Sequence, residues 1–260
     1  MTPLLPPDLV PALHAEARKV STLRSNRTLV GTLLAVTLVA TGVTALISGP
    51  ADPKSDPATG AASVGLYLGI AVTVVAAGIF GAFAAGAEFR NGSMPLTVLS
   101  APDRDRVVAS KYLVTAVSAM AACLGVDLVG FGCLLLVGRD KVEVGPRLFA
   151  VLGCALIAVT CWSLIGAGLA LLLRQASGTV ALLVAWLVVI EPLIWVVAGA
   201  LDIGGIATLL PGSATVGSVA VGSFVDSDIL APTPAALVVL LLWTVGVAGA
   251  GWWTFRTREL

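Results

Sequence analysis

Charged side chains are scarce in this chain. Aspartate, glutamate, lysine and arginine make up 12% of its 260 residues, whereas 58% of the residues are hydrophobic and the mean hydropathy is +1.01. Soluble domains carry about 25% charged residues, and half of that share cannot cover a water-facing surface of this size. The composition therefore argues against a soluble globular enzyme, and its hydrophobicity excludes intrinsic disorder. The class that remains is a polytopic membrane protein.

The chain also lacks a net charge and the common motifs of catalysis. Its fifteen basic residues balance fifteen acidic ones, so no basic excess points to nucleic acid as a partner. It has neither a G-x-x-x-x-G-K-[ST] phosphate-binding loop nor a G-x-S-x-G nucleophile motif. His14 is the single histidine, and the four cysteines form no C-x-x-C pair. The sequence predicts no catalytic residue, metal or cofactor in this chain, and it predicts packing roles for the cysteines: Cys123, Cys133, Cys154 and Cys161.

Long hydrophobic runs are what the sequence has in abundance. A helix needs about 20 apolar residues to cross the hydrocarbon core of a bilayer. The alternation of a membrane β-barrel is absent, so the fold class is predicted to be all-α, with six transmembrane helices. These spans are residues 29–48, 62–86, 108–137, 148–173, 179–200 and 235–255.

The basic residues are unevenly shared between the segments that connect these spans. Eleven of the fifteen lie before the first span, in the second loop and the adjoining first turn of the third span, in the fourth loop, and after the last span. The other three loops together carry four. Because segments rich in lysine and arginine stay on the cytoplasmic side, both ends of the chain are predicted to be cytoplasmic.

Residues 1–28 are predicted to form a cytoplasmic interfacial helix, ahead of a six-helix transmembrane domain over 29–260. An apolar stripe runs along residues 8–27, and polar side chains such as Glu16 and Lys19 occupy the rest of the surface. The alternative is a basic tail that only obeys the positive-inside rule. The stripe consists of Leu9, Leu13, Ala17 and Val20, with Arg24 able to snorkel.

The second loop, residues 87–107, has the signals of a short helix beneath the membrane. Asn91 and Gly92 form a turn signal, and Ser93 can cap the helix that follows. The spacing predicts an amphipathic helix over 94–99. Held between two spans, such a helix can receive a push from a cytoplasmic partner.

The last outer loop, residues 201–234, contains no lysine or arginine and is too apolar for a solvated loop. Gly204-Gly205 and Pro211-Gly212 interrupt it. We expect a re-entrant or interfacial hairpin on the outer face, where protein or water covers the non-helical backbone.

Two carboxylates, Asp127 and Glu191, lie inside the third and fifth spans. Ionisable groups at membrane depth are expensive and mark functional sites by default. They could line an exit path, bind a cationic substrate or take protons. The alternative is a neutral, hydrogen-bonded carboxyl group between packed helices.

The second span contains a glycine pattern, Gly65-x-x-x-Gly69, which permits close helix contact within the chain or in a dimer.

Three segments resemble motifs of one transporter family. Glu88-Phe89-Arg90-Asn91-Gly92-Ser93 resembles the E-[FY]-R-x-G-[ST] motif of ABC-2 type transporter permeases, which leads from the second span into the coupling helix. Glu16-Ala17-Arg18-Lys19, followed by Arg24, resembles the E-x-x-K-x-x-x-x-R entry helix of that family. Leu209-Leu210-Pro211-Gly212 resembles the Leu-Pro element before its last span.

The resemblance implies a permease subunit in the bacterial cytoplasmic membrane, embedded in the lipid bilayer. A separate ABC ATP-binding subunit would hold ATP and Mg²⁺, and a second permease copy or a sister chain would complete the transporter. The expected activity is export of a hydrophobic or cationic compound. Glu88 would anchor the coupling helix, and Arg90 would orient it or meet headgroups or the ATPase. The alternative is an ordinary snorkelling pair at a helix end. The residues implied in coupling to the ATPase are Glu88, Phe89, Arg90, Gly92, Ser93, Leu96 and Leu99.

Two other functions stay open at this point. A proton-coupled secondary carrier would use Asp127 and Glu191, although the spans show no inverted repeat. A non-transporting subunit of a membrane assembly would need neither carboxylate.

Overall fold

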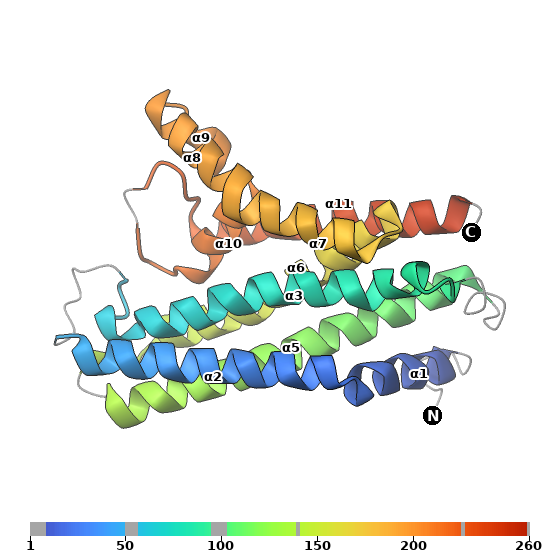
Figure 1. Ribbon diagram of the computed structural model, residues 1–260. Helices are drawn as coiled ribbons and strands as arrows, with labels where there is room; N and C mark the ends of the chain where they lie inside the picture. Colours follow the sequence, from blue (N-terminus) through green and yellow to red (C-terminus); the bar gives the residue numbers. More distant parts are fainter. Residues whose placement is uncertain (1–8, 50–56, 95–102, 139–140, 225–226, 259–260) are drawn as a thin grey trace, which may run out of the picture.

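The chain folds as a bundle of helices, which Figure 1 shows from the side. The computed structural model describes residues 9–49, 57–94, 103–138, 141–224 and 227–258, and within these ranges it contains helices and no strand. Six helical segments are long and apolar enough to cross a membrane, which confirms the six predicted spans. They are α2 (Arg24–Ile47), the 3-10 turn η1 with α3 (Ala61–Ser63, Val64–Arg90), α5 (Arg104–Val137), α6 (Pro146–Leu173), the segment α7–η3–α8 (Ala176–Ala185, Trp186–Ile190, Glu191–Ala200) and α11 (Thr233–Thr257).

The first helix, α1 (Leu9–Thr22), is separate from the first span. The helix predicted over 8–27 breaks at Leu23, whose ψ of 119° is extended, and α2 begins directly afterwards. α1 packs against α5, and the residue that it buries most deeply is Glu16. The expectation that Glu16 lies on the polar outer face is therefore wrong, because this carboxylate has partners inside the bundle. α1 and the end of α11 lie at the same end of the bundle (Figure 1), called here the α1 end.

α3 and α6 form the centre of the bundle and are its most buried spans. Small residues let their backbones touch. A methyl group on Gly81 would overlap the carbonyl oxygen of Ser163, and one on Gly166 would overlap the carbonyl oxygen of Gly78. Lipid tails are as apolar as leucine, so close packing of this kind holds membrane helices together.

The Gly65-x-x-x-Gly69 pattern makes its contact within the chain. A side chain on Gly65 would overlap the backbone of Ala40 and Thr41, and one on Gly69 would meet the side chain of Thr37. These three residues belong to α2, so the two glycines seat α3 directly against the first span.

The fifth span is the least buried of the six. The first part of this span, α7, packs against α3. The last part, α8, diverges from the bundle at the end opposite α1 (Figure 1). A π-helical turn, η3, separates the two halves just before Glu191 and Pro192. A proline-associated kink is expected here from the sequence, and the π-turn shows how the backbone absorbs it.

Residues 201–224 return toward the bundle through α9 (Gly204–Ala207) and α10 (Pro211–Val219). α10 is largely buried and packs against α6 and α11. This burial is what a re-entrant segment requires. The helix expected over 94–99 falls, apart from the buried Met94, outside the described residues.

The α3–α6 contact can be tested with two alanine substitutions in the same helix. Gly166→Ala places a methyl group against the backbone of α3, and we expect a loss of about 1–3 kcal/mol in unfolding free energy from overpacking. Gly153→Ala is the control, because Gly153 is exposed and no atom lies within 4 Å of the added carbon. It should be neutral or stabilise α6 slightly. Thermal unfolding in detergent compares the two, and equal midpoints would contradict the close contact.

Candidate functional site

Three elements bring charged side chains together at the α1 end. Glu16 and Lys19 come from α1, and Glu88 lies in the last turn of α3. Lys111 lies about two turns into α5. α5 has 34 residues, more than the roughly 20 needed to cross a bilayer, so a charge in its first turns need not enter the hydrocarbon core. The second loop, 87–107, joins α3 to α5 and therefore begins and ends beside these residues.

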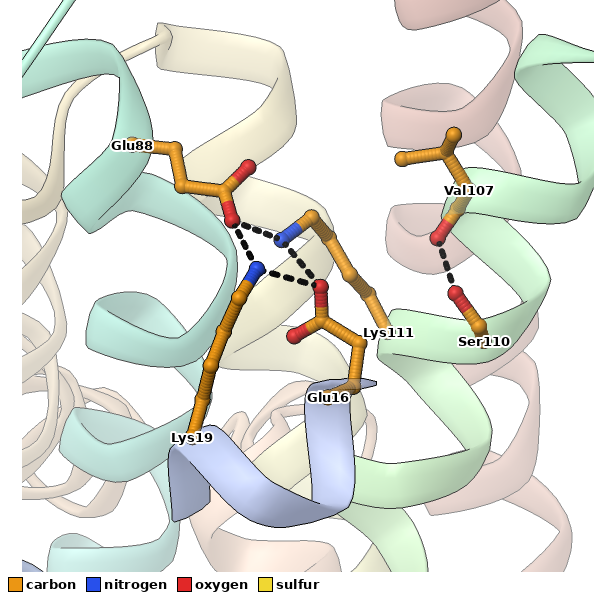
Figure 2. A network of polar contacts seen from close by, with 6 residues as sticks. All are labelled: Glu16, Lys19, Glu88, Val107, Ser110 and Lys111. Atoms are coloured by element: carbon orange, nitrogen blue, oxygen red, sulfur yellow. Dashed lines mark hydrogen bonds and ion pairs between the residues drawn. The ribbon is translucent and has the colours of Figure 1, made fainter. Parts of the chain in front are cut away.

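The four side chains form a ring of alternating charge, called here the charge ring (Figure 2). Lys19 Nζ lies 2.9 Å from Glu16 Oε1 and 2.6 Å from Glu88 Oε1. Lys111 Nζ lies 3.2 Å and 3.0 Å from the same two oxygens. Each ammonium thus meets two carboxylates, and each of these carboxylate oxygens meets two ammonium groups.

The two lysines of the charge ring differ in burial. The side chain of Lys111 is 1% exposed, whereas that of Lys19 is 47% exposed. A buried ammonium is tolerated only when counter-charges replace its lost hydration, and Glu16 and Glu88 provide them. Glu88 Oε2 is buried as well and has no hydrogen-bond partner among the described residues. The ring therefore consists of a buried ion cluster around Lys111 and a half-exposed closing residue, Lys19.

Lys19 stays charged across the physiological range. Partial burial lowers its pKa, but hydrogen bonds and attraction to Glu88 and Glu16 outweigh this effect, and the net result is a raised pKa. A raised pKa in the folded state means that the stabilisation is complete below the ordinary pKa of lysine and is lost only as the pH rises through the higher folded value. The ion pairs of Lys19 are thus insensitive to pH near neutrality.

Gly92, in the segment from Glu88 to Ser93, has a clear structural role. α3 ends in a Schellman motif, in which the N–H of Gly92 donates to the Phe89 carbonyl (3.3 Å) and the N–H of Ser93 donates to the Glu88 carbonyl (3.0 Å). Gly92 has a φ of +65°, which side chains with a Cβ rarely adopt. The Schellman turn thus ends α3 just after Glu88, and it uses the backbone carbonyl of this residue as an acceptor.

The other motif residues point to different neighbours. The ring of Phe89 packs edge-on against the buried Phe255 of α11, with centroids 6.4 Å apart at 79°. Arg90 is exposed. The Glu-Phe-Arg segment thus contacts α1 and α5 through the first residue and α11 through the second, and it presents the third outward. Leu96 and Leu99 lie outside the described residues.

The two carboxylates at membrane depth have separate partners. Glu191 is 1% exposed, and its Oε1 accepts the backbone N–H of Ser213 at 2.6 Å. Its Oε2 accepts the indole N–H of Trp186 at 3.0 Å. Glu191 therefore caps the N-terminus of α10, where helix N–H groups lack partners of their own. Asp127 is 5% exposed and contacts the thiol of Cys123, but its Oδ1 has no partner among the described residues.

Sequence reasoning missed the role of Lys111. By sequence, Lys111 is only one of the basic charges near the second loop, whereas the structure buries it at the centre of the charge ring. The signal available was a lone lysine in the otherwise apolar start of the third span. Its partners come from two distant segments, so the pairing itself is not visible in the sequence.

The helix lengths and hydropathy define a multi-pass helical membrane protein. A scan of the chain against known protein families finds no matching family, and a search of curated proteins finds no match.

Removal of each lysine in turn tests the charge ring. Lys111→Met removes the buried cation and leaves the two carboxylates with only the half-exposed Lys19 as a counter-charge. We expect a loss of about 3–5 kcal/mol in stability. Lys19→Ala removes a half-exposed charge, and exposed ion pairs contribute only about 0–1 kcal/mol. Thermal unfolding in detergent measures both. If Lys19→Ala cost as much as Lys111→Met, the buried cation would not be the centre of the cluster.

Substitution of Gly92 tests the turn that ends α3. Gly92→Ala must adopt a positive φ, which costs about 1–2 kcal/mol for a residue with a Cβ. Nothing lies within 4 Å of the added carbon, so a steric clash does not contribute. Gly92→Asn should cost less, because asparagine tolerates this conformation. Unfolding midpoints in the order glycine, asparagine, alanine are expected, and equal midpoints for alanine and glycine would contradict the Schellman turn.

Proposed function

We propose that the chain is the permease subunit of an ABC-2 type ATP-driven transporter in the bacterial cytoplasmic membrane, with both ends of the chain in the cytoplasm. The observation that carries the proposal is the charge ring. It links α1, α3 and α5 at the two ends of the second loop. A loop that receives force from a partner needs this kind of stiff connection to the spans.

Further contacts extend the connection to the last span. The Asp103 carboxylate caps α5 by accepting the N–H of Asp105 at 3.1 Å. Asp105 in turn accepts the indole N–H of Trp252 in α11 at 2.9 Å. With the contact between Phe89 and Phe255, both ends of the second loop are joined to α11. A push on the loop would thus move α3, α5 and α11 together.

The division of labour follows from what the sequence lacks. No phosphate-binding loop is present, so in this proposal a separate ABC ATP-binding subunit holds ATP and Mg²⁺. A second permease copy or a sister chain supplies the other half of the membrane path. The subunit would export a hydrophobic or cationic compound, because the spans are apolar and carry two carboxylates, Asp127 and Glu191.

The secondary-carrier alternative rests on Asp127 alone. Its unpartnered oxygen among the described residues is what a proton-accepting group would present. Both oxygens of Glu191, in contrast, accept hydrogen bonds that hold α10 and Trp186. This engagement supports a positioning role for Glu191 and leaves the carrier with a single carboxylate. A non-transporting assembly subunit would need neither residue.

Co-purification is the direct test of the proposed partner. A C-terminally tagged chain would be extracted from native membranes in mild detergent, and its companions would be identified by mass spectrometry. We expect a stoichiometric P-loop ATPase. Its reproducible absence, with the tagged chain folded and monodisperse, would contradict the proposal and favour a carrier that works without ATP.

Substitution of Glu88 tests the coupling role. In the reconstituted complex, Glu88→Ala should lower transport at least tenfold while the ATPase still hydrolyses ATP, because the link between loop and spans is loosened. Glu143→Ala is the control, since Glu143 is an exposed acidic residue at the opposite end of the bundle. Membrane insertion should be unchanged in both variants. Normal transport by Glu88→Ala would show that Glu88 does not couple the two subunits.

A further inference from the structure

Three tryptophans lie near the middle of their spans. They are Trp162 of α6, Trp186 at the start of η3 and Trp243 of α11. Tryptophan in membrane proteins is enriched at the two interfaces, where its amphipathic ring meets the headgroups. Trp252 and Trp253, near the end of α11, fit that pattern, but mid-span positions do not. The three indoles instead line one cavity of about 210 Å³, with Pro211 of α10 as a further wall.

Each of the three indole N–H groups is already bound to the protein. Trp162 donates to Thr215 Oγ1 (2.7 Å), Trp186 to Glu191 Oε2 (3.0 Å) and Trp243 to the Leu209 carbonyl (2.9 Å). These bonds fix the rings, and the N–H groups are not left over for a ligand. The other lining side chains are aliphatic: Ile165, Leu169, Leu182, Leu183 and Val247.

This lining selects against most ligand classes. A sugar, a peptide or a phosphate would lose hydrogen bonds to water and find no side-chain donor in return, which is costly. An organic cation with an apolar surface has no hydrogen bonds to lose. Such a cation is attracted to the negative face of an aromatic ring, most strongly to tryptophan.

A buried carboxyl group bonded to one of the indoles favours the same charge. Glu191 is 1% exposed, and its Oε2 accepts the indole N–H of Trp186 at 3.0 Å. The N-terminus of α10 faces this carboxylate, and its dipole contributes roughly half a positive charge. An ionised Glu191 therefore leaves the local charge negative.

The cavity shares part of its lining with a neighbouring space. A second space of about 350 Å³ shares Trp243 and Val247 with the first, and it is also lined by Leu209 and Leu242. Trp243, at the boundary between them, is 39% exposed. The pair of spaces suits a cationic head among the indoles and an apolar body along α11, within the size range of drug-like ligands.

We propose that the cavity lined by Trp162, Trp186 and Trp243 binds a hydrophobic organic cation of the quaternary ammonium or phosphonium class. As a substrate site, it rests on the transport role proposed above. As a binding site, it needs no ATPase, so the two proposals can fail separately.

Direct binding to the purified full chain tests the site. The probe is radiolabelled tetraphenylphosphonium, added to the chain in phosphatidylcholine nanodiscs, and empty nanodiscs measure partition into lipid. We expect saturable binding of one cation per chain. Trp243→Leu, which removes a ring, should weaken binding about tenfold. Trp243→Phe, which keeps a ring, should stay within about threefold of the native affinity.

A matched control and a charge test complete the experiment. Trp253→Leu removes an indole that is 67% exposed near the end of α11, and it should bind normally. Phenyltrimethylammonium and tert-butylbenzene have the same shape and differ only in charge. Concentrations of both compounds are expressed per lipid. On the native chain, phenyltrimethylammonium should displace the probe at least ten times more effectively than tert-butylbenzene does.

The outcomes are distinct. Equal displacement by the two compounds would overturn the proposal and identify an apolar cavity of the kind that a lipid tail fills. Binding no greater than in empty nanodiscs would also overturn it. The comparison of the charged and the neutral competitor is made on the native chain. It therefore still tests the proposal if Trp243→Leu fails to fold. Cation binding by a chain that recruits no ATPase would support the site and contradict the transporter proposal. A chain that recruits an ATPase but binds no cation would support the transporter proposal and contradict the site.

Discussion

The ammonium group of Lys111 constrains the whole α1 end of the molecule. A buried cation must have counter-charges, and the two that it has come from α1 and from the end of α3. The positions of three segments far apart in the chain are thus set by one requirement. The extended Leu23 separates α1 from α2, and α1 packs against α5 with Glu16 beside Lys111.

Close backbone contact holds the rest of the bundle, and it does so unevenly. Glycines seat α3 against α2 and α6, and Gly168 of α6 seats that helix against α11 in the same way. The fifth span has no comparable set of contacts beyond α7, and its far half diverges (Figure 1). In that half, the carboxylate of Glu191 accepts the backbone N–H of Ser213, in the first turn of α10. The bundle thus combines a tightly packed centre with a more loosely attached fifth span.

Much of the fold was predictable from composition and periodicity. The six spans follow from the length of the apolar runs alone, and the structure has them within a few residues. The polar character of Glu16 was misleading, because amphipathic patterning assigns a charged residue to the outer face unless its partner is known. For the same reason Lys111 was not recognised as part of the site. The roles of Asp127 and Glu191 were left open by sequence, and only the position of Ser213 identifies Glu191 as a helix cap.

The sequence by itself determined that this is a six-span helical membrane protein, because the cost of burying polar groups in lipid acts on each segment separately. It also determined where α3 ends, since Gly92 provides a conformation that few other residues adopt. Only the tertiary structure decided which charges meet and which indoles share a cavity. Those contacts join residues 95 positions apart, as in Lys111 and Glu16, and they depend on how the helices are packed rather than on any local pattern.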